Sequence, residues 1–303
     1  MHSLRNPLAG AAALAIALAL TAAVGPAAGA SSLLRAREQQ KAHVAIVAPK
    51  ISGRLSTGGP TTGRRQNAGC PAGTTMTNGD AAGYGACAPS VQSFTKVSDF
   101  SVIPNIPVCN ECVARATFGI ELANNKKFAS TGPRIVEPVA ADGVLIQQAS
   151  TGNSYFTFWA LGTSTGTLMI HPMTTVNEGD KISATVEQSG NKAVFTVIDH
   201  THPMKDSFHR TQTCGGCTFT TAEWGVSAIP LDTGTGYYQL PEFGTWKISQ
   251  AVAATSSGSG TISGFGWTNL TLVNQAMIPK VLATAGPLNA TGSGFADTWI
   301  AAS

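Results

Sequence analysis

Residues 181–199 read Lys-Ile-Ser-Ala-Thr-Val-Glu-Gln-Ser-Gly-Asn-Lys-Ala-Val-Phe-Thr-Val-Ile-Asp, and this stretch predicts a β-hairpin. Apolar side chains occupy every second position in each half, first Ile182, Ala184 and Val186, then Ala193, Phe195 and Val197. A period of two is typical of strands that bury one face. Between the halves, Gln188-Ser189-Gly190-Asn191 supplies the polar and glycine residues of a turn.

The same pattern recurs along the chain, whereas helical periodicity is almost absent after residue 66. Further short runs are rich in alternating or β-branched residues: Tyr155–Leu161, Thr167–His171, Thr245–Ser249 and Thr268–Val273. Turn residues separate these runs, as in Asn177-Glu178-Gly179-Asp180 and the Ser/Gly tract at 256–260. Many short strands joined by such turns predict an all-β fold, an antiparallel two-sheet sandwich.

The first 30 residues are predicted to be a secretory signal peptide. Arg5 gives a positive start, Ala11 to Val24 is apolar, and Ala28-Gly29-Ala30 offers a small-residue cleavage site. We therefore expect a secreted, extracellular protein with no membrane contact after the signal is removed. An uncleaved N-terminal anchor is the alternative.

Residues 31–65 form a basic segment in front of a mildly acidic domain. They hold seven Lys and Arg residues against Glu38 alone. After residue 65, 11 of the 19 Lys and Arg residues remain, against 15 of the 16 acids. Opposite charges favour docking of the segment on residues 66–303, and protonation of carboxylates weakens it. We interpret 31–65 as a pro-segment with Arg64-Arg65 as a processing site, or else as a linker.

The distribution of basic residues also bears on whether the protein binds nucleic acid. The basic residues are few and scattered, without interleaved aromatics, which argues against nucleic-acid binding. We expect a monomer.

Six cysteines behind a signal peptide indicate disulfides. Proximity suggests the pairs Cys70–Cys87, Cys109–Cys112 and Cys214–Cys217, although spacing alone does not fix the connectivity. Zinc bound by the two Cys-x-x-Cys pairs is the alternative.

One carboxylate stands out, because only 12% of the chain is charged and Glu223 lies between Ala222 and Trp224. Gln147 and Gln148 end another apolar run. A carboxylate takes a proton from an attacking water, and a glutamine amide stabilises an oxyanion. The alternatives are ordinary polar residues on strands, or a glycosidase that pairs Glu223 with Glu242.

Nine motifs in order resemble the glutamic peptidases, the eqolisin family. They begin with Asp80–Tyr84 and include Thr117–Glu121, the strand Tyr155–Leu161, and Phe243-Gly244-Thr245. Ile146–Thr151 resembles the motif that carries the family's catalytic glutamine, and Thr221-Ala222-Glu223-Trp224 resembles the one that carries its glutamate.

The resemblance implies a concanavalin-like jelly roll of two antiparallel sheets, with the active site on the concave side. It implies an acid endopeptidase that acts on polypeptides without a metal or organic cofactor. Glu223 would be the general base, and Gln148, or alternatively Gln147, would stabilise the oxyanion. Adjacent strand residues face opposite sides, so only one glutamine can face the cleft. Glu121, Phe158 and Trp224 are expected to line the cleft.

Glu121 stands where the family has an aspartate, which keeps the charge but moves it by one methylene. Three other positions depart further from the family pattern, because Ala81 and Thr117 replace tryptophans and Ala160 replaces a glutamate. These changes leave a second hypothesis open, a non-catalytic β-sandwich that binds carbohydrate or another surface. Asp199-His200-Thr201-His202 with His209 is a further candidate, either for a metal site or for a solvated loop.

Overall fold

The computed structural model describes residues 44–47, 73–89, 92–109, 112–124, 138–162, 167–229, 237–274 and 278–302. The predicted signal peptide lies outside the described residues, and of the segment 31–65 only Val44–Val47 is described. Within this part of the chain, no helix has the length and hydropathy needed to cross a bilayer.

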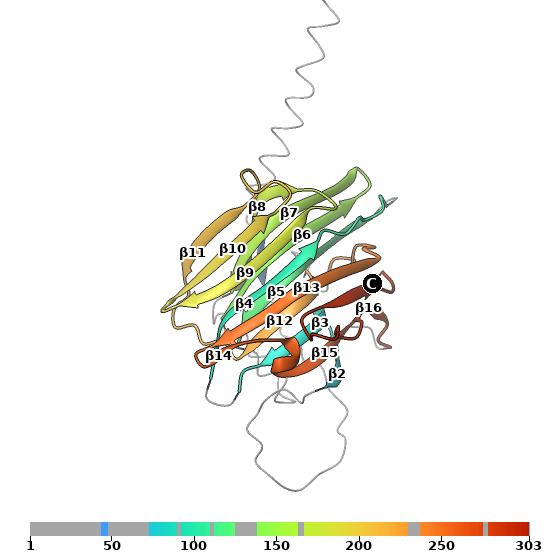
Figure 1. The fold of residues 1–303 in the computed structure, drawn as a ribbon. Helices are drawn as coiled ribbons and strands as arrows, with labels where there is room; N and C mark the ends of the chain where they lie inside the picture. Colours follow the sequence, from blue (N-terminus) through green and yellow to red (C-terminus); the bar gives the residue numbers. More distant parts are fainter. Residues whose placement is uncertain are drawn as a thin grey trace, which may run out of the picture. The chain divides into compact units, whose positions relative to one another are not determined.

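The described residues form strands almost throughout (Figure 1). In chain order they are β1 (Val44–Val47), β2 (Thr74–Asn78), β3 (Ala81–Cys87), β4 (Phe94–Val102), β5 (Val113–Ala123), β6 (Val139–Ala149), β7 (Gly152–Gly162), β8 (Thr167–Val176), β9 (Lys181–Ser189), β10 (Lys192–Asp199), β11 (Phe208–Thr213), β12 (Thr221–Ala228), β13 (Thr245–Thr255), β14 (Gly258–Thr261), β15 (Gly266–Val273), β16 (Val281–Ala285) and β17 (Phe295–Trp299). The hairpin predicted for residues 181–199 is the pair β9–β10.

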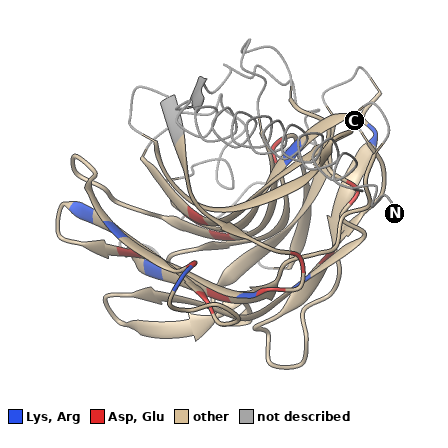
Figure 2. Ribbon diagram, turned by 90° about the horizontal axis from the view of Figure 1, so that it is seen from above, with Lys and Arg blue, Asp and Glu red and all other residues tan. Residues whose placement is uncertain are grey.

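These strands build two layers, which Figure 2 shows as curved ribbons stacked on one another. The first layer has the order β1-β8-β7-β6-β5-β12-β3-β15, and the second has the order β11-β10-β9-β4-β13-β17-β16. Strand β15 belongs to both, because its first half pairs with β3 and its second half with β16. All pairs are antiparallel except β2 with β15. The predicted two-sheet antiparallel sandwich is confirmed.

The core lies between the layers and is filled by alternate residues of each strand. Trp224 of β12 is 1% exposed, and its indole N–H donates to the carbonyl oxygen of Ser98 in β4 at 3.0 Å. Phe118 of β5 meets Phe243 and Trp246 edge to face, with centroids 5.2 and 5.1 Å apart. These contacts bury large aromatic surfaces and satisfy the one polar atom of the tryptophan.

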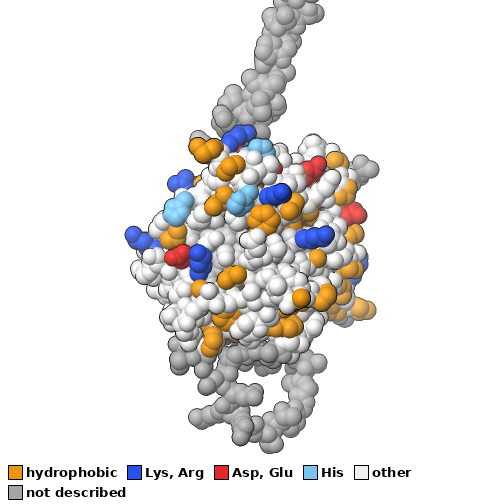
Figure 3. Space-filling view, in the orientation of Figure 1, with side chains coloured by type: hydrophobic (Ala, Val, Ile, Leu, Met, Phe, Trp, Pro, Cys, Tyr) orange, Lys and Arg blue, Asp and Glu red, His pale blue; other side chains and the backbone are white. Residues whose placement is uncertain are grey.

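The face drawn in Figure 3 carries scattered charges. Its Lys and Arg side chains are dispersed among hydrophobic, uncharged polar and a few acidic groups, and on this face they form no continuous basic stripe.

Cysteine pairs close two short loops. Disulfides join Cys109 to Cys112 and Cys214 to Cys217, as their proximity suggests, so these thiols are not arranged as a four-cysteine zinc site. Cys87 is also disulfide-bonded. Its expected partner, Cys70, lies outside the described residues.

A row of glycines crosses the first layer. Gly83 on β3, Gly225 on β12, Gly119 on β5 and Gly143 on β6 stand in register on four neighbouring strands. A Cβ atom on Gly225 would lie 2.0 Å from the carbonyl oxygen of Ala82, and one on Gly83 would lie 2.0 Å from that of Trp224. Both glycines also have positive φ, 156° and 140°. Glycine inside a strand marks such bends and close backbone approaches.

Replacement of one glycine in this row should destabilise the fold. We expect Gly225→Ala to lower the free energy of unfolding by about 3 kcal/mol or more, because the new methyl group meets backbone that cannot move aside. Urea denaturation followed by tryptophan fluorescence measures this change. Gly264→Ala is the matched control, since a Cβ atom there meets nothing within 4 Å. Equal stabilities for the two variants would contradict the steric argument.

Carboxyl groups are buried between the layers. Asp99 of β4 and Asp142 of β6 are 4% and 0% exposed. Burial raises the pKa of Asp99 to about 7, against a partial opposing effect from the backbone N–H of Ala184. Burial also raises the pKa of Asp142 well above its ordinary range, and the nearby Asp99 raises it further. Asp297 of β17 is buried with a pKa raised in the same way.

These buried acids make stability depend on pH. The pKa of Asp99 is higher in the folded chain than its ordinary value of 3.8, so the folded state binds this proton more tightly. Its contribution is complete below about pH 4 and is lost as the pH rises through about 7. The loss amounts to about 4 kcal/mol.

We therefore expect Asp99→Asn to flatten the dependence of unfolding free energy on pH between 4 and 7, because the amide does not titrate. Urea denaturation at several pH values measures it. Glu242→Gln, which changes an exposed carboxylate, should keep the wild-type slope. If Asp99→Asn keeps it as well, Asp99 is not a source of the pH dependence.

Candidate functional site

A cavity opens on the face of the first layer that is turned away from the core. The space between its lining atoms, open solvent included, is about 650 Å³. Residues from β12, β5, β3, β6, β7 and β8 surround it, including Glu223, Glu121, Gly119, Gly225, Phe158 and Ile170. Successive residues of β12 face the core and the cavity in turn. Ala222, Trp224 and Val226 are buried in the core, and the residues between them face outward, because side chains alternate along a strand.

Two carboxylates stand directly opposite one another in this cavity. Glu223 on β12 is in register with Glu121 on the adjacent strand β5, and both are partly buried. Side chains at directly opposed antiparallel positions share a face, with Cβ atoms about 4.5–5.5 Å apart. The same row continues to Ala141 on β6 and Ala160 on β7. The polar part of this row is therefore a pair of glutamates.

The structure does not bring either predicted glutamine to Glu223. Gln147 is six residues along β6 from Ala141, the residue that shares a row with Glu223. At about 3.3 Å per residue this amounts to about 20 Å along the strand. Gln147 lies on the same face as Glu223 and is in register with Arg115 and Ser154.

Gln148, which the motif comparison favours for the cleft, faces the other side of the sheet. It is 4% exposed, and its side-chain amide donates to the carbonyl oxygen of Pro107 at 2.6 Å. The expectation that Gln148 faces the cleft is wrong, because its parity along β6 is opposite to that of the cavity residues. Its hydrogen bond ties β6 to the segment after β4.

Of the other predicted cleft residues, some have side chains in the cavity and some have side chains in the core. Phe158 and Glu121 line the cavity. Trp224 borders it, but its indole ring is buried and bonded to Ser98, so the ring packs in the core. Trp159, next to Phe158, packs against the core and stacks on His171 with ring centroids 3.9 Å apart.

The three departures from the family pattern all lie at this cavity. Ala81, Thr117 and Ala160 are among the residues that border it. Small side chains at these positions leave open space that larger ones would fill. Ala141, Leu145, Phe158, Ala160, Ile170 and Ile229 form a separate apolar cluster at this face.

The remaining sequence candidates lie elsewhere. Glu242 is exposed and does not border the cavity, so the structure does not pair it with Glu223. The rings of His200 and His209 bond to the hydroxyls of Ser183 and Thr196. His202 instead lies near two aspartates.

Residues 80–288 match the model of the peptidase A4 family. The protein belongs to this family. The resemblance to glutamic peptidases seen in the motifs is therefore confirmed. The peptidase A4 match spans every strand that borders the cavity, and of the described strands only β1, β2 and β17 lie outside it. No curated protein matches the chain.

Two solved structures share the fold of this peptidase A4 chain. Both are crystal structures of scytalido-glutamic peptidase, one with a transition state analog inhibitor and one with a peptide-based transition state analog. Sequence identity is 10% and 11%, and each match has a TM-score of 0.56 and covers 73% of this chain and 98% of the other. At this identity the likeness supports the fold alone.

Proposed function

We propose that the chain is a secreted acid endopeptidase in which Glu223 and Glu121 act as a pair. The observation that carries the proposal is their direct opposition across β12 and β5, inside a cavity of a glutamic peptidase fold. Glu223 keeps the role of general base that the family motif gives it. Glu121 takes the place in the chemistry that the motif comparison gave to a glutamine.

Two neighbouring carboxylates repel when both are charged, and one shared proton removes the repulsion. The ionised Glu223 takes a proton from the water that attacks the peptide carbonyl. The protonated Glu121 donates a hydrogen bond to the carbonyl oxygen as it becomes negative. The proton on Glu223 then passes to the leaving amine, and the pair returns to its starting state. A protonated carboxyl and an amide both offer a donor at this place, but only the carboxyl needs acid.

Gln147 has a binding role in this proposal. It lies on the cavity face about 20 Å from the glutamates, beside Arg115, whose guanidinium stacks on the Tyr238 ring at 4.4 Å. An extended polypeptide reaches this distance in about six residues. Gln147 therefore suits contact with a remote part of the substrate.

Variants of the pair test the mechanism with a denatured protein substrate between pH 2 and 7. Glu223→Gln should lower kcat at least about 10³-fold, and Glu121→Ala should lower it about 10²- to 10³-fold. Glu121→Gln should stay within about tenfold of the wild type and keep its activity at higher pH, because its amide donates without titrating. Glu242→Gln is the control.

Two outcomes would contradict this assignment. Full activity of Glu223→Gln would exclude Glu223 as the base. A loss in Gln148→Ala as large as that in Glu223→Gln, in a folded variant, would favour the glutamine and not Glu121 as the oxyanion donor.

Ala141 and Ala160 favour a second function, because they occupy the row of Glu223 and Glu121 without any polar group. In this case the chain is a non-catalytic module that binds carbohydrate or another surface ligand. Absence of cleavage at every pH, together with retention on a polysaccharide column, would support this second function over the peptidase.

We also propose that residues 31–65 act as a pro-segment. The support is its basic charge and the antiparallel pairing of Val44–Val47 with β8, whose Ile170 borders the cavity. A peptide of residues 31–65, added to protein that starts at residue 66, should inhibit cleavage near pH 6 and lose potency towards pH 3 as carboxylates are protonated. A peptide with its Lys and Arg residues replaced by Gln is the control, and equal inhibition by both would exclude electrostatic docking.

A further inference from the structure

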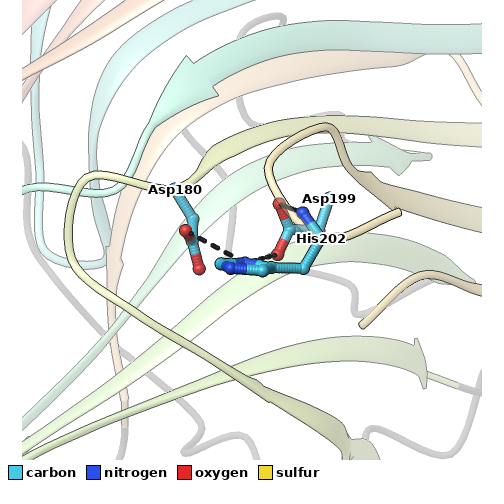
Figure 4. A group of neighbouring side chains, drawn as sticks. All are labelled: Asp180, Asp199 and His202. Carbon is cyan, nitrogen blue, oxygen red and sulfur yellow. Dashed lines mark hydrogen bonds and ion pairs between the residues drawn. The ribbon is translucent and has the colours of Figure 1, made fainter. Parts of the chain in front are cut away.

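Asp180, Asp199 and His202 converge where two loops meet, away from the cavity (Figure 4). Asp180 ends the turn before β9, Asp199 ends β10, and His202 lies in the loop that follows. The antiparallel register pairs Asp199 with Ile182, which brings the two aspartates to the same end of the β9–β10 hairpin. One ligand atom from each of the three side chains lies within 4.8 Å of the others.

One oxygen of each aspartate is already engaged in its own loop. Asp180 Oδ2 accepts from the backbone N–H of Asn177 at 2.8 Å, and Asp199 Oδ1 accepts from the backbone N–H groups of Thr201 and His202 at 2.7 and 3.1 Å. The second oxygen of each aspartate points to His202 Nδ1, as Figure 4 shows.

The second oxygen of Asp199 is the informative one. The side chain of Asp199 is fully buried, and its Oδ2 accepts no hydrogen bond from the described residues. A buried carboxylate oxygen without a donor is costly, and such oxygens usually have a partner or bind a metal. A cation next to Asp199 Oδ2 would compensate its charge.

The two distances from His202 Nδ1 fit ligands of one metal ion better than they fit hydrogen bonds, and the two aspartate oxygens lie within 4.8 Å of each other. His202 Nδ1 lies 3.5 Å from Asp180 Oδ1 and 3.5 Å from Asp199 Oδ2. Charged N–H···O bonds are shorter, about 2.7–2.9 Å. Ligand atoms about 2.1 Å from a zinc ion at the tetrahedral angle lie about 3.4 Å from each other.

We propose that Asp180 Oδ1, Asp199 Oδ2 and His202 Nδ1 bind a divalent transition-metal ion of the zinc class. Imidazole with two carboxylates suits such an ion, whereas Ca²⁺ and Mg²⁺ require six or more oxygen-type ligands. The side chain of His202 is 47% exposed, which leaves the fourth position open to water. The site is separate from the glutamate pair and does not depend on the proposed peptidase function.

The metal would fasten the two loops to each other and to the end of β4. The backbone of Asp180 accepts from the N–H of Ile103, and the N–H of Gly179 donates to the carbonyl oxygen of Ile103, both at 3.0 Å. Ligands from two loops therefore hold a third segment in place. The proposed metal ion therefore has a structural role. The imidazole of His202 must be neutral to bind it, so metal binding should weaken in acid.

Titration of the Glu223→Gln protein with Zn²⁺ at pH 7.5, by calorimetry, tests the site without self-cleavage. We expect one equivalent to bind with a Kd of about 10 μM or lower, a rise in Tm with added Zn²⁺, and binding at least about 100-fold weaker at pH 4.5. Cobalt should give the intense visible absorption of a four-coordinate site.

His202→Ala is the decisive variant, because this side chain is half exposed and we expect the fold to tolerate its loss. It should weaken zinc binding at least about 100-fold, whereas His209→Ala and His200→Ala should bind as the parent does. Absence of zinc binding by folded protein, or unchanged binding in His202→Ala, would overturn the proposal. A third result would also overturn the proposal. If the parent protein binds no zinc and His202→Ala has a lower Tm than the parent in acid, then a protonated His202 bridges the two aspartates and no metal is involved.

Discussion

The close approach of backbones along the glycine row is the constraint on which the cavity depends. Gly83, Gly225, Gly119 and Gly143 carry no side chain, so the backbones of four neighbouring strands approach closely along one line. The row of Glu223, Glu121 and Ala141 lies two residues away along these strands. Gly119 and Gly225 of the glycine row line the cavity, and the two carboxylates stand two residues away from them, on strands and not on loops.

Each strand at this site serves both the cavity and the core. In β12, Glu223 faces the cavity while its neighbour Trp224 fills the core and bonds to the opposite layer. In β7, Phe158 likewise faces the cavity while Trp159 packs against the core. The position of the carboxylate along its strand is therefore fixed by the packing of the tryptophan, since a slip of one residue would exchange the two sides.

The strands and the two-sheet fold could be predicted from the sequence, because they depend on local periodicity. The alternation in residues 181–199 gives the β9–β10 hairpin, and the motif around Glu223 indicates the strand that carries the carboxylate. The structure places neither Gln147 nor Gln148 beside Glu223, and the reason is physical. A period of two tells which residues share a face, but it does not tell how far along the neighbouring strand a residue lies, so Gln147 and Gln148 matched a motif while Ala141 occupies the row. The same limit hid Asp180, because the register of a hairpin and not its sequence spacing brings it to Asp199 and His202.

Protons act in opposite senses at different places in this molecule. Asp99, Asp142 and Asp297 are held between the layers with raised pKa values, so protonation favours the packed core. In the proposed mechanism, a proton shared by Glu223 and Glu121 would likewise relieve the repulsion of two opposed carboxylates. At the end of the β9–β10 hairpin, a proton would compete with the proposed metal ion for the same nitrogen atom of His202. Acid therefore favours the packed core and the proposed chemistry, whereas the proposed metal cross-link between the hairpin-end loops would need neutral pH.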